Sequence, residues 1–228
     1  MKKIKNTVAV ILAMALLVAA SVGITVAYLT DRDSEENIFT LGNVDITLDE
    51  VFQQNSMLMP GEKIEKKPTI RNTGITDAWV WATVAIPAAL DNVGDASKNV
   101  VHFNYTKESV AAGLWTWTGA NGDWMVEKNV DINGTAYNVY TVLYQTPLKP
   151  GESTAHPVIH QVYMDDHVDV DGDGYLTWVE NGAATRIDWN VTTQALPTIH
   201  VSAYAIQHDG FDNVWDAYAA YQAQWSNP

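Results

Sequence analysis

Downstream of residue 43 the chain is built from short segments in which apolar and polar positions alternate. Val44, Ile46 and Leu48 alternate with polar residues, and this period is typical of a half-buried β-strand. Residues 78–86 alternate with apolar side chains on both sides, which predicts a strand buried on both faces, or with one face against a helix. Further strands are predicted over residues 64–72, 114–118, 123–127, 136–144, 154–164, 189–193 and 198–207.

Turn residues separate these segments. Pro-Gly-Glu occurs twice, within residues 59–62 and 149–152, and places Pro and Gly where a type II turn needs them. The four residues 119–122 and the pair Asn133-Gly134 predict two hairpins. Leu196-Pro197 interrupts the last two strands, because proline cannot donate to a sheet ladder.

The period changes near the C-terminus. In residues 212–225 the aromatic residues recur at near-helical spacing and alanine is frequent, so a short helix is predicted there, with Asp212 as its N-cap. No stretch supports βαβ alternation. The expected fold is all-β, a jelly-roll-like β-sandwich with a short C-terminal helix.

The N-terminus has the organisation of a secretory signal peptide. Lys2, Lys3 and Lys5 precede an uncharged apolar run, and small or β-branched residues end the run at Ala27. This pattern predicts cleavage between Ala27 and Tyr28. The alternative is a permanent anchor, because an apolar run of about 20 residues is long enough to cross a bilayer. With cleavage, residues 28–228 form a single exported domain with no stable membrane span.

Composition narrows the functional class. The formal net charge is −14, and removing the three signal-peptide lysines changes it to 10 − 27 = −17. Such a surface repels nucleic acid and favours cations. There is no cysteine, so burial or bound metal has to stabilise the exported fold. Nine Trp and ten Tyr each bury roughly 150–250 Å² when packed.

The strongest chemical motif is a calcium loop at residues 169–180, inserted between strands. Every informative position of a twelve-residue EF-hand-like loop is filled. Gly174 supplies the sharp turn at position 6. The predicted calcium ligands, in loop order, are Asp169, Asp171, Asp173, the backbone carbonyl of Tyr175, Thr177 and Glu180. A single extracellular site of this kind suits a structural role, with a dissociation constant of roughly 10⁻⁴–10⁻³ M.

Signals for catalysis are weak. His156 and His160 have a spacing that serves zinc on a helix, but Pro157 and β-branched neighbours favour a strand, which would separate the two side chains by about 13 Å. No glutamate follows the first histidine, and there is no cysteine nucleophile or Gly-x-Ser-x-Gly elbow. Asp165-Asp166 beside His167 is interpreted as loop polarity. We expect a protein that is not an enzyme.

Tryptophans gather around the hairpin predicted at residues 119–122. Trp115, Trp117 and Trp124 lie on its two sides and predict a cross-strand aromatic cluster. Two interpretations follow, a platform for carbohydrate or a protein partner, and core packing. Core packing is favoured because a sandwich this rich in tryptophan needs them inside.

Two stretches carry a family resemblance. Residues 24–50 contain AYLTDRDS and FTLGNVDITLDE, and residues 201–211 read VSAYAIQHDGF. Both resemble TasA/camelysin-type proteins of Gram-positive bacteria. The resemblance implies a dedicated, ER-type signal peptidase that frees the chain at Tyr28. It also implies a matrix protein of the biofilm, in which the N-terminal segment of one subunit completes the sheet of the next.

The resemblance assigns this donor role to residues 28–39. The physical basis is β-augmentation, in which an extended segment adds backbone hydrogen bonds along a sheet edge. The acidic run Asp31–Glu36 would then sit at the rim. The expected function is a secreted or cell-surface fibre subunit stabilised by calcium. The alternatives are a monomeric module that binds a glycan or protein, and a camelysin-like metalloprotease.

Overall fold

The computed structural model describes residues 30–33, 44–52, 60–93, 95–104, 114–119, 121–194 and 198–225. In chain order its elements are β1 (Thr30–Asp33), β2 (Ile46–Phe52), β3 (Lys63–Asn72), β4 (Ala78–Pro87), η1 (Ala88–Leu90), η2 (Ala96–Lys98), β5 (Val101–Asn104), β6 (Trp115–Thr116), β7 (Val126–Ile132), β8 (Thr135–Tyr144), β9 (Gln161–Met164), β10 (Val168–Val170), β11 (Tyr175–Glu180), β12 (Ala183–Asn190), β13 (His200–Gln207) and α3 (Val214–Trp225). The all-β class with a short C-terminal helix is confirmed; the finer jelly-roll-like description stays a prediction.

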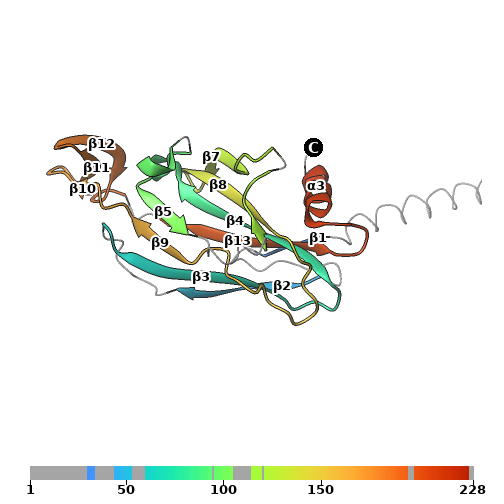
Figure 1. The fold of residues 1–228 in the computed structure, drawn as a ribbon. Helices are drawn as coiled ribbons and strands as arrows, with labels where there is room; N and C mark the ends of the chain where they lie inside the picture. The colour runs from blue at the N-terminus through green and yellow to red at the C-terminus, as the bar shows by residue number, and fades with distance from the viewer. Residues whose placement is uncertain are drawn as a thin grey trace, which may run out of the picture.

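The strands form three antiparallel sheets. The six-stranded sheet has the order β1-β13-β4-β8-β6, with β7 also paired to β8. The four-stranded sheet has the order β2-β3-β9-β5, and the small sheet the order β10-β11-β12. Figure 1 shows the two larger sheets one above the other, with the small sheet at the end away from α3.

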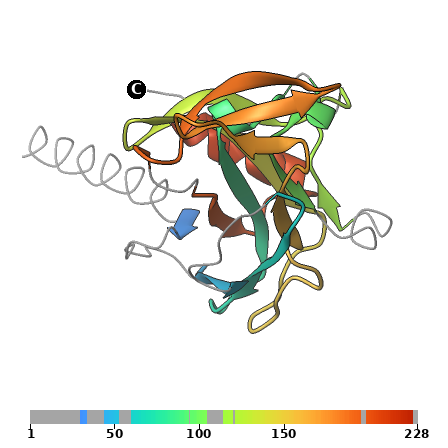
Figure 2. The ribbon, with the colours of Figure 1, turned by 90° about the vertical axis from the view of Figure 1, so that its left-hand side faces the viewer.

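The main core fills the space between the two larger sheets. Ile46, Ile64 and Ile70 contribute from the four-stranded sheet, and Val80 and Val142 from the six-stranded sheet. Each fully buried side chain of this kind stabilises the fold by roughly 1.5–3 kcal/mol. Figure 2 views the molecule along the strands and shows the separation of the layers.

A second apolar cluster lies on the outer face of the six-stranded sheet, beneath α3. Trp79 and Trp81 of β4 point to this side, whereas Val80 between them points to the main core. The Trp81 ring lies 4.8 Å from that of Tyr221 and 5.6 Å from that of Tyr218, measured between centroids. The strand predicted to be buried on both faces is therefore β4, with one face against a helix.

The N-cap of the helix lies one residue later than predicted. Asn213 caps it, because its Oδ1 accepts from the backbone N of Trp215 at 2.9 Å and of Asp216 at 3.0 Å. The Asn213 amide also donates to the Asp216 carboxylate at 2.7 Å. Asp212, the expected cap, lies just outside the helix. Among the described residues, no helix is long and apolar enough to cross a membrane.

Several turns match the prediction. Gly61 and Gly151 have φ of 74° and 82°, in the left-handed region that a type II turn requires at its third residue. The Glu152 amide donates to the Lys149 carbonyl at 2.9 Å and closes the second turn. Asn133 and Gly134 both have positive φ, as a type I′ turn between β7 and β8 requires.

Two predicted strands are placed differently. Regular strand structure follows the second Pro-Gly-Glu turn only at β9, because Pro157 lacks an amide proton and interrupts the ladder. The strand predicted over residues 189–193 is instead β12, which ends at Asn190. Leu196-Pro197 lies outside the described residues.

Candidate functional site

The N-terminal segment supplies the outer strand of the six-stranded sheet. Thr30 of β1 lies opposite Ile206 of β13, and Asp33 lies opposite Ala203. Four residues of the predicted donor segment thus pair with the sheet of their own chain. The remainder of that segment, the Ala27–Tyr28 junction and the predicted signal peptide lie outside the described residues.

The predicted calcium loop folds as a β-hairpin. Its strands are β10 and β11, and its tip is organised by Asp171, whose Oδ1 accepts from the backbone N of Asp173 at 3.0 Å and of Tyr175 at 2.9 Å. The Arg186 guanidinium lies between two tip carboxylates, 2.6 Å from Asp171 Oδ2 and 2.8 Å from Asp173 Oδ2. The Tyr175 amide, followed by Arg186, lowers the pKa of Asp171.

Gly174 makes this tip tight. Its φ of 86° is left-handed, and a Cβ at this position would lie 2.5 Å from Thr192 Cγ2. Thr192 is itself fixed, because its amide and hydroxyl both donate to Asn190 Oδ1. Glycine is therefore required at position 6 of the motif, both for the left-handed backbone and because Thr192 leaves no room for a Cβ.

The other loop residues are divided between the two strands. Asp169 pairs with Thr177 across the hairpin, and the Thr177 hydroxyl donates to the Asp169 carbonyl at 3.3 Å. The Tyr175 carbonyl accepts from the Asp171 amide at 2.9 Å. Glu180 lies at the far end of β11, where it pairs with Lys98.

Glu180 is separated from the tip because β11 is extended. Its position is five residues beyond Tyr175, which corresponds to roughly 17 Å of strand. In a helix the same residues would span roughly 7.5 Å. The structure thus brings together Asp171 and Asp173, and it does not bring Glu180 to them.

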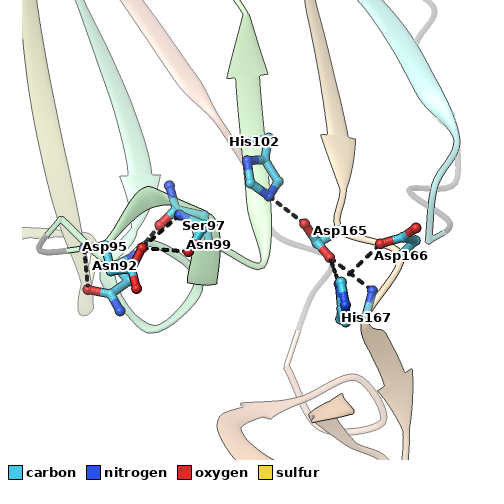
Figure 3. Close-up of polar contacts among 8 residues, drawn as sticks. All are labelled: Asn92, Asp95, Ser97, Asn99, His102, Asp165, Asp166 and His167. Carbon is cyan, nitrogen blue, oxygen red and sulfur yellow. Dashed lines mark hydrogen bonds and ion pairs between the residues drawn. The ribbon is translucent and has the colours of Figure 1, made fainter. Parts of the chain in front are cut away.

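A second polar cluster lies at the turn between β9 and β10 (Figure 3). The Asp165 carboxylate lies between two imidazoles, with Oδ2 2.9 Å from His102 Nε2 and Oδ1 2.7 Å from His167 Nδ1. Asp166 Oδ1 is 3.2 Å from the same His167 nitrogen. Within the described ranges, the potential metal ligands of Asp165, Asp166 and His167 lie within 4.8 Å of one another.

Rings and backbone bonds hold this cluster in place. His102 stacks on Tyr163 with 4.8 Å between centroids, and His167 stacks on Trp178 with 5.1 Å between centroids. The Asp165 amide donates to the Val100 carbonyl at 2.9 Å. Figure 3 also shows the neighbouring loop, where the Asp95 side chain accepts from the Ser97 amide and caps η2.

The surroundings of the cluster favour the charged forms of Asp165 and His167. Burial alone would raise the pKa of Asp165, but hydrogen bonds from the His167 amide and both imidazoles lower it overall. The hydrogen bond to Asp165, and then the charges of Asp165, Asp166 and Glu180, raise the pKa of His167. Sequence reasoning missed His102, because only the pairing of β5 with β9 brings it here.

His156 and His160 lie on the irregular segment before β9. The His156 carbonyl accepts from Trp115 Nε1 at 3.1 Å, and the His160 carbonyl accepts from the Lys66 amide at 3.2 Å. Neither belongs to the group of potential metal ligands found in the described residues. The segment is not helical, so the spacing of this pair does not place both rings on one helix face.

Two of the three clustered tryptophans are in the core. Trp115 and Trp117 are buried, whereas Trp124 is 44% exposed. The rings of Trp117 and Trp124 are 5.9 Å apart, and the Met125 amide donates to the Trp117 carbonyl across the predicted hairpin. Core packing is therefore confirmed for Trp115 and Trp117, whereas Trp124 is partly exposed to solvent.

A cleft of about 880 Å³ separates the small sheet from the main body. Its lining includes Trp178, Lys98 and Lys128, and one wall carries the buried Asp91. Asp91 Oδ2 accepts from Asn138 Nδ2 at 2.8 Å and from the Tyr140 hydroxyl at 2.7 Å. Asp91 Oδ1 is buried and has no hydrogen-bond partner among the described residues.

Comparison with known proteins found a family match for the N-terminal part of the chain. Residues 2–106 match the family model described as Camelysin metallo-endopeptidase. Over this stretch, just under half of its length, the chain is similar to the camelysin family. The match ends just after β5, so it includes His102 but neither the turn at 165–167 nor the predicted calcium loop. No curated protein and no solved structure matches the chain.

Proposed function

We propose that this camelysin-type chain is an exported matrix subunit that assembles by exchanging β1 between neighbouring copies. The observation that supports this is the pairing of β1 with β13. A segment close to the predicted signal-peptidase site thus forms the outermost strand of the largest sheet. Members of this family are typically extracellular, which agrees with the predicted signal peptide.

The edge of β13 is longer than the strand that covers it. β1 faces Ala203–Ile206, whereas β13 has eight residues, so residues 200–202 have no strand on that side within the described ranges. A donor of twelve residues, 28–39, is long enough to pair along the whole edge. Such a segment can pair with the edge of its own chain or with the same edge of a neighbouring copy, through backbone hydrogen bonds.

Exchange of this kind leads to a filament. The same backbone contacts form within or between copies, so swapping changes the local energy little and depends on concentration. Donor and acceptor are different surfaces, and such head-to-tail contacts continue indefinitely unless they close into a ring. The charge of −17 on each subunit opposes assembly, so salt and divalent cations should promote it.

The deciding experiment is negative-stain microscopy of Tyr28–Pro228 beside a chain starting at Gly42, both with calcium. Fibres from the first and monomers from the second support donor exchange. Monomers from both, or fibres from both, contradict it. A labelled peptide of residues 28–41 should bind the shortened chain, and a scrambled peptide of equal charge should not.

Calcium remains part of the proposal, at the hairpin tip. Asp171 and Asp173 already converge on Arg186, a cation, and Ca²⁺ prefers six to eight oxygen ligands. We expect calcium to raise the melting temperature, with the rise lost in an Asp171→Asn, Asp173→Asn double variant. If Glu180→Gln also abolishes the rise, the loop rearranges into the twelve-residue form; if it does not, Glu180 is not a ligand.

The cleft favours a second candidate function, recognition of a glycan. Trp178 contributes an aromatic side chain to the cleft lining, and Lys98, Lys128 and Asn129 contribute polar side chains that could bind sugar hydroxyls. Binding of monomeric protein to a polysaccharide column, lost in Trp178→Ala, would support this function. The peptidase activity in the family's description is tested by incubating the pure protein with casein, with and without a chelator. Chelator-sensitive cleavage that is lost in the His156→Ala, His160→Ala double variant would support this activity, and absence of cleavage would contradict it.

A further inference from the structure

The turn between β9 and β10 has the donor chemistry of a transition-metal site. Zn²⁺ binds histidine nitrogen at about 2.0–2.1 Å and carboxylate oxygen at about 2.0–2.2 Å. His167 offers Nδ1, and Asp165 and Asp166 each offer a carboxylate oxygen. This mixed set differs from the hairpin tip, where the donors are oxygens alone. Among the described residues, this turn is where three such ligand atoms lie within 4.8 Å of one another.

The spacing of the donors is close to that of a tetrahedral ion. Bonds of this length place neighbouring ligand atoms about 3.3 Å apart. His167 Nδ1 lies 2.7 Å from Asp165 Oδ1 and 3.2 Å from Asp166 Oδ1. The third pair, the carboxylate oxygens of Asp165 and Asp166, lies within 4.8 Å. Rotation of the exposed Asp166 side chain and loss of the imidazole proton would let all three donors meet one ion.

We propose that Asp165, Asp166 and His167 bind a divalent transition metal of the Zn²⁺ class, and that His102 is the positioning residue for Asp165. His102 contacts Oδ2 of Asp165, which leaves Oδ1 for the ion. A histidine–carboxylate pair around a metal fixes the orientation of the ligand. The side chains of His102 and Asp165 are only 17% and 16% exposed, so their mutual orientation is maintained by packing.

The site is open on its outer side. The side chains of Asp166 and His167 are 81% and 51% exposed, and three protein ligands leave one tetrahedral position for water or a further ligand. This inference does not depend on fibre formation, because none of these residues belongs to β1 or β13.

The test is titration of Tyr28–Pro228, which keeps every described residue, with ZnCl₂ by calorimetry in excess calcium. Co²⁺ absorption provides a second readout of ligand geometry. We expect one saturable site, lost in His167→Gln and weakened in Asp166→Asn. His102→Gln should lower the affinity roughly 10- to 100-fold, as removal of a positioning partner does.

Two matched controls separate this site from others. His156→Gln with His160→Gln removes the other closely spaced histidines, and Asp171→Asn removes a tip carboxylate; both should keep the affinity of the parent chain. Absence of saturable zinc binding, or binding lost with His156 and His160 but retained in His167→Gln, would overturn the proposal. Circular dichroism melting of each variant verifies that loss of binding is not loss of fold.

Discussion

Removing the hydroxyl of Tyr140 tests the buried contact that joins the loop after β4 to β8. The hydroxyl donates to Asp91 Oδ2 at 2.7 Å, and Asn138 Nδ2 donates to the same oxygen at 2.8 Å. Tyr140→Phe deletes one oxygen atom. It keeps the ring, which packs edge-on against Phe103 and Trp124 with centroids 5.3 and 5.8 Å away. The variant therefore isolates one hydrogen bond.

The expected loss of stability is about 1.5–3 kcal/mol, the range for a hydrogen bond to a charged group. The upper part of the range is favoured because Asp91 Oδ1 has no partner among the described residues, so Asn138 alone would remain on the side chain. For a chain of this length each kcal/mol corresponds to roughly 2–4 °C in melting temperature. Urea unfolding followed by tryptophan fluorescence measures the difference.

Tyr163→Phe is the matched control, because the described residues give its hydroxyl no hydrogen bond while its ring stacks on His102. It should change the free energy of unfolding by less than about 0.5 kcal/mol. A Tyr140→Phe variant as stable as this control, with an unchanged urea slope, would refute the assigned role of the hydroxyl.

The same contact predicts a dependence on alkaline pH. Burial first, and then the hydrogen bond to Asp91 and its negative charge, raise the pKa of Tyr140 far above its ordinary value of about 10. Above pH about 10 the unfolded chain loses this proton and the folded chain keeps it, so unfolding becomes more favourable. The stability advantage of the parent chain over Tyr140→Phe should shrink above that pH. An advantage that stays constant would contradict the assignment.

Three further predictions concern the hairpin and the helix. In thermal melting, Gly174→Ala should destabilise the fold by at least about 1–2 kcal/mol because of its left-handed φ. Adding Thr192→Ser should relieve the clash between the new Cβ and Thr192 Cγ2. Gly172→Ala, with open space around it, should leave the melting temperature unchanged. Arg186→Gln should strengthen calcium binding up to about fivefold by calorimetry, since it removes a competing cation worth little by itself; weaker binding would show that the tip needs this cation. Trp81→Ala should destabilise by about 3–5 kcal/mol in urea, and a loss below about 1 kcal/mol would contradict the packing beneath α3.

The sequence predicted those parts of the fold whose conformation depends on neighbouring residues alone. Buried and more exposed residues alternate along β3, and almost all of β4 is buried, as the sequence pattern predicts. Gly61, Gly151 and Gly134 adopt the φ values that their turns require. The pair Asn181-Gly182 was missed as a turn, although both residues have positive φ and this dipeptide is the strongest short hairpin signal. That turn defines β12.

The candidate sites depended on contacts that local patterns do not contain. The calcium motif predicted a sharp turn at Gly174, and this residue has a left-handed φ of 86°; calcium binding itself stays a prediction. Whether Glu180 lies near the tip depends on whether a helix or a strand follows Tyr175. His102 and Asp165 are far apart in sequence and meet only through the register of β5 with β9. No spacing rule connects residues on strands whose pairing is unknown.

The helix α3 has a consequence for the physical form of any fibre. It covers Trp79, Trp81, Leu143 and Ile206 on the outer face of the six-stranded sheet, so sheets of successive subunits cannot stack face to face. Cross-β fibrils diffract at about 4.7 Å along the fibril and about 10 Å between stacked sheets. Fibres built from this fold should lack that paired signature and should instead show an axial repeat of the size of a folded subunit.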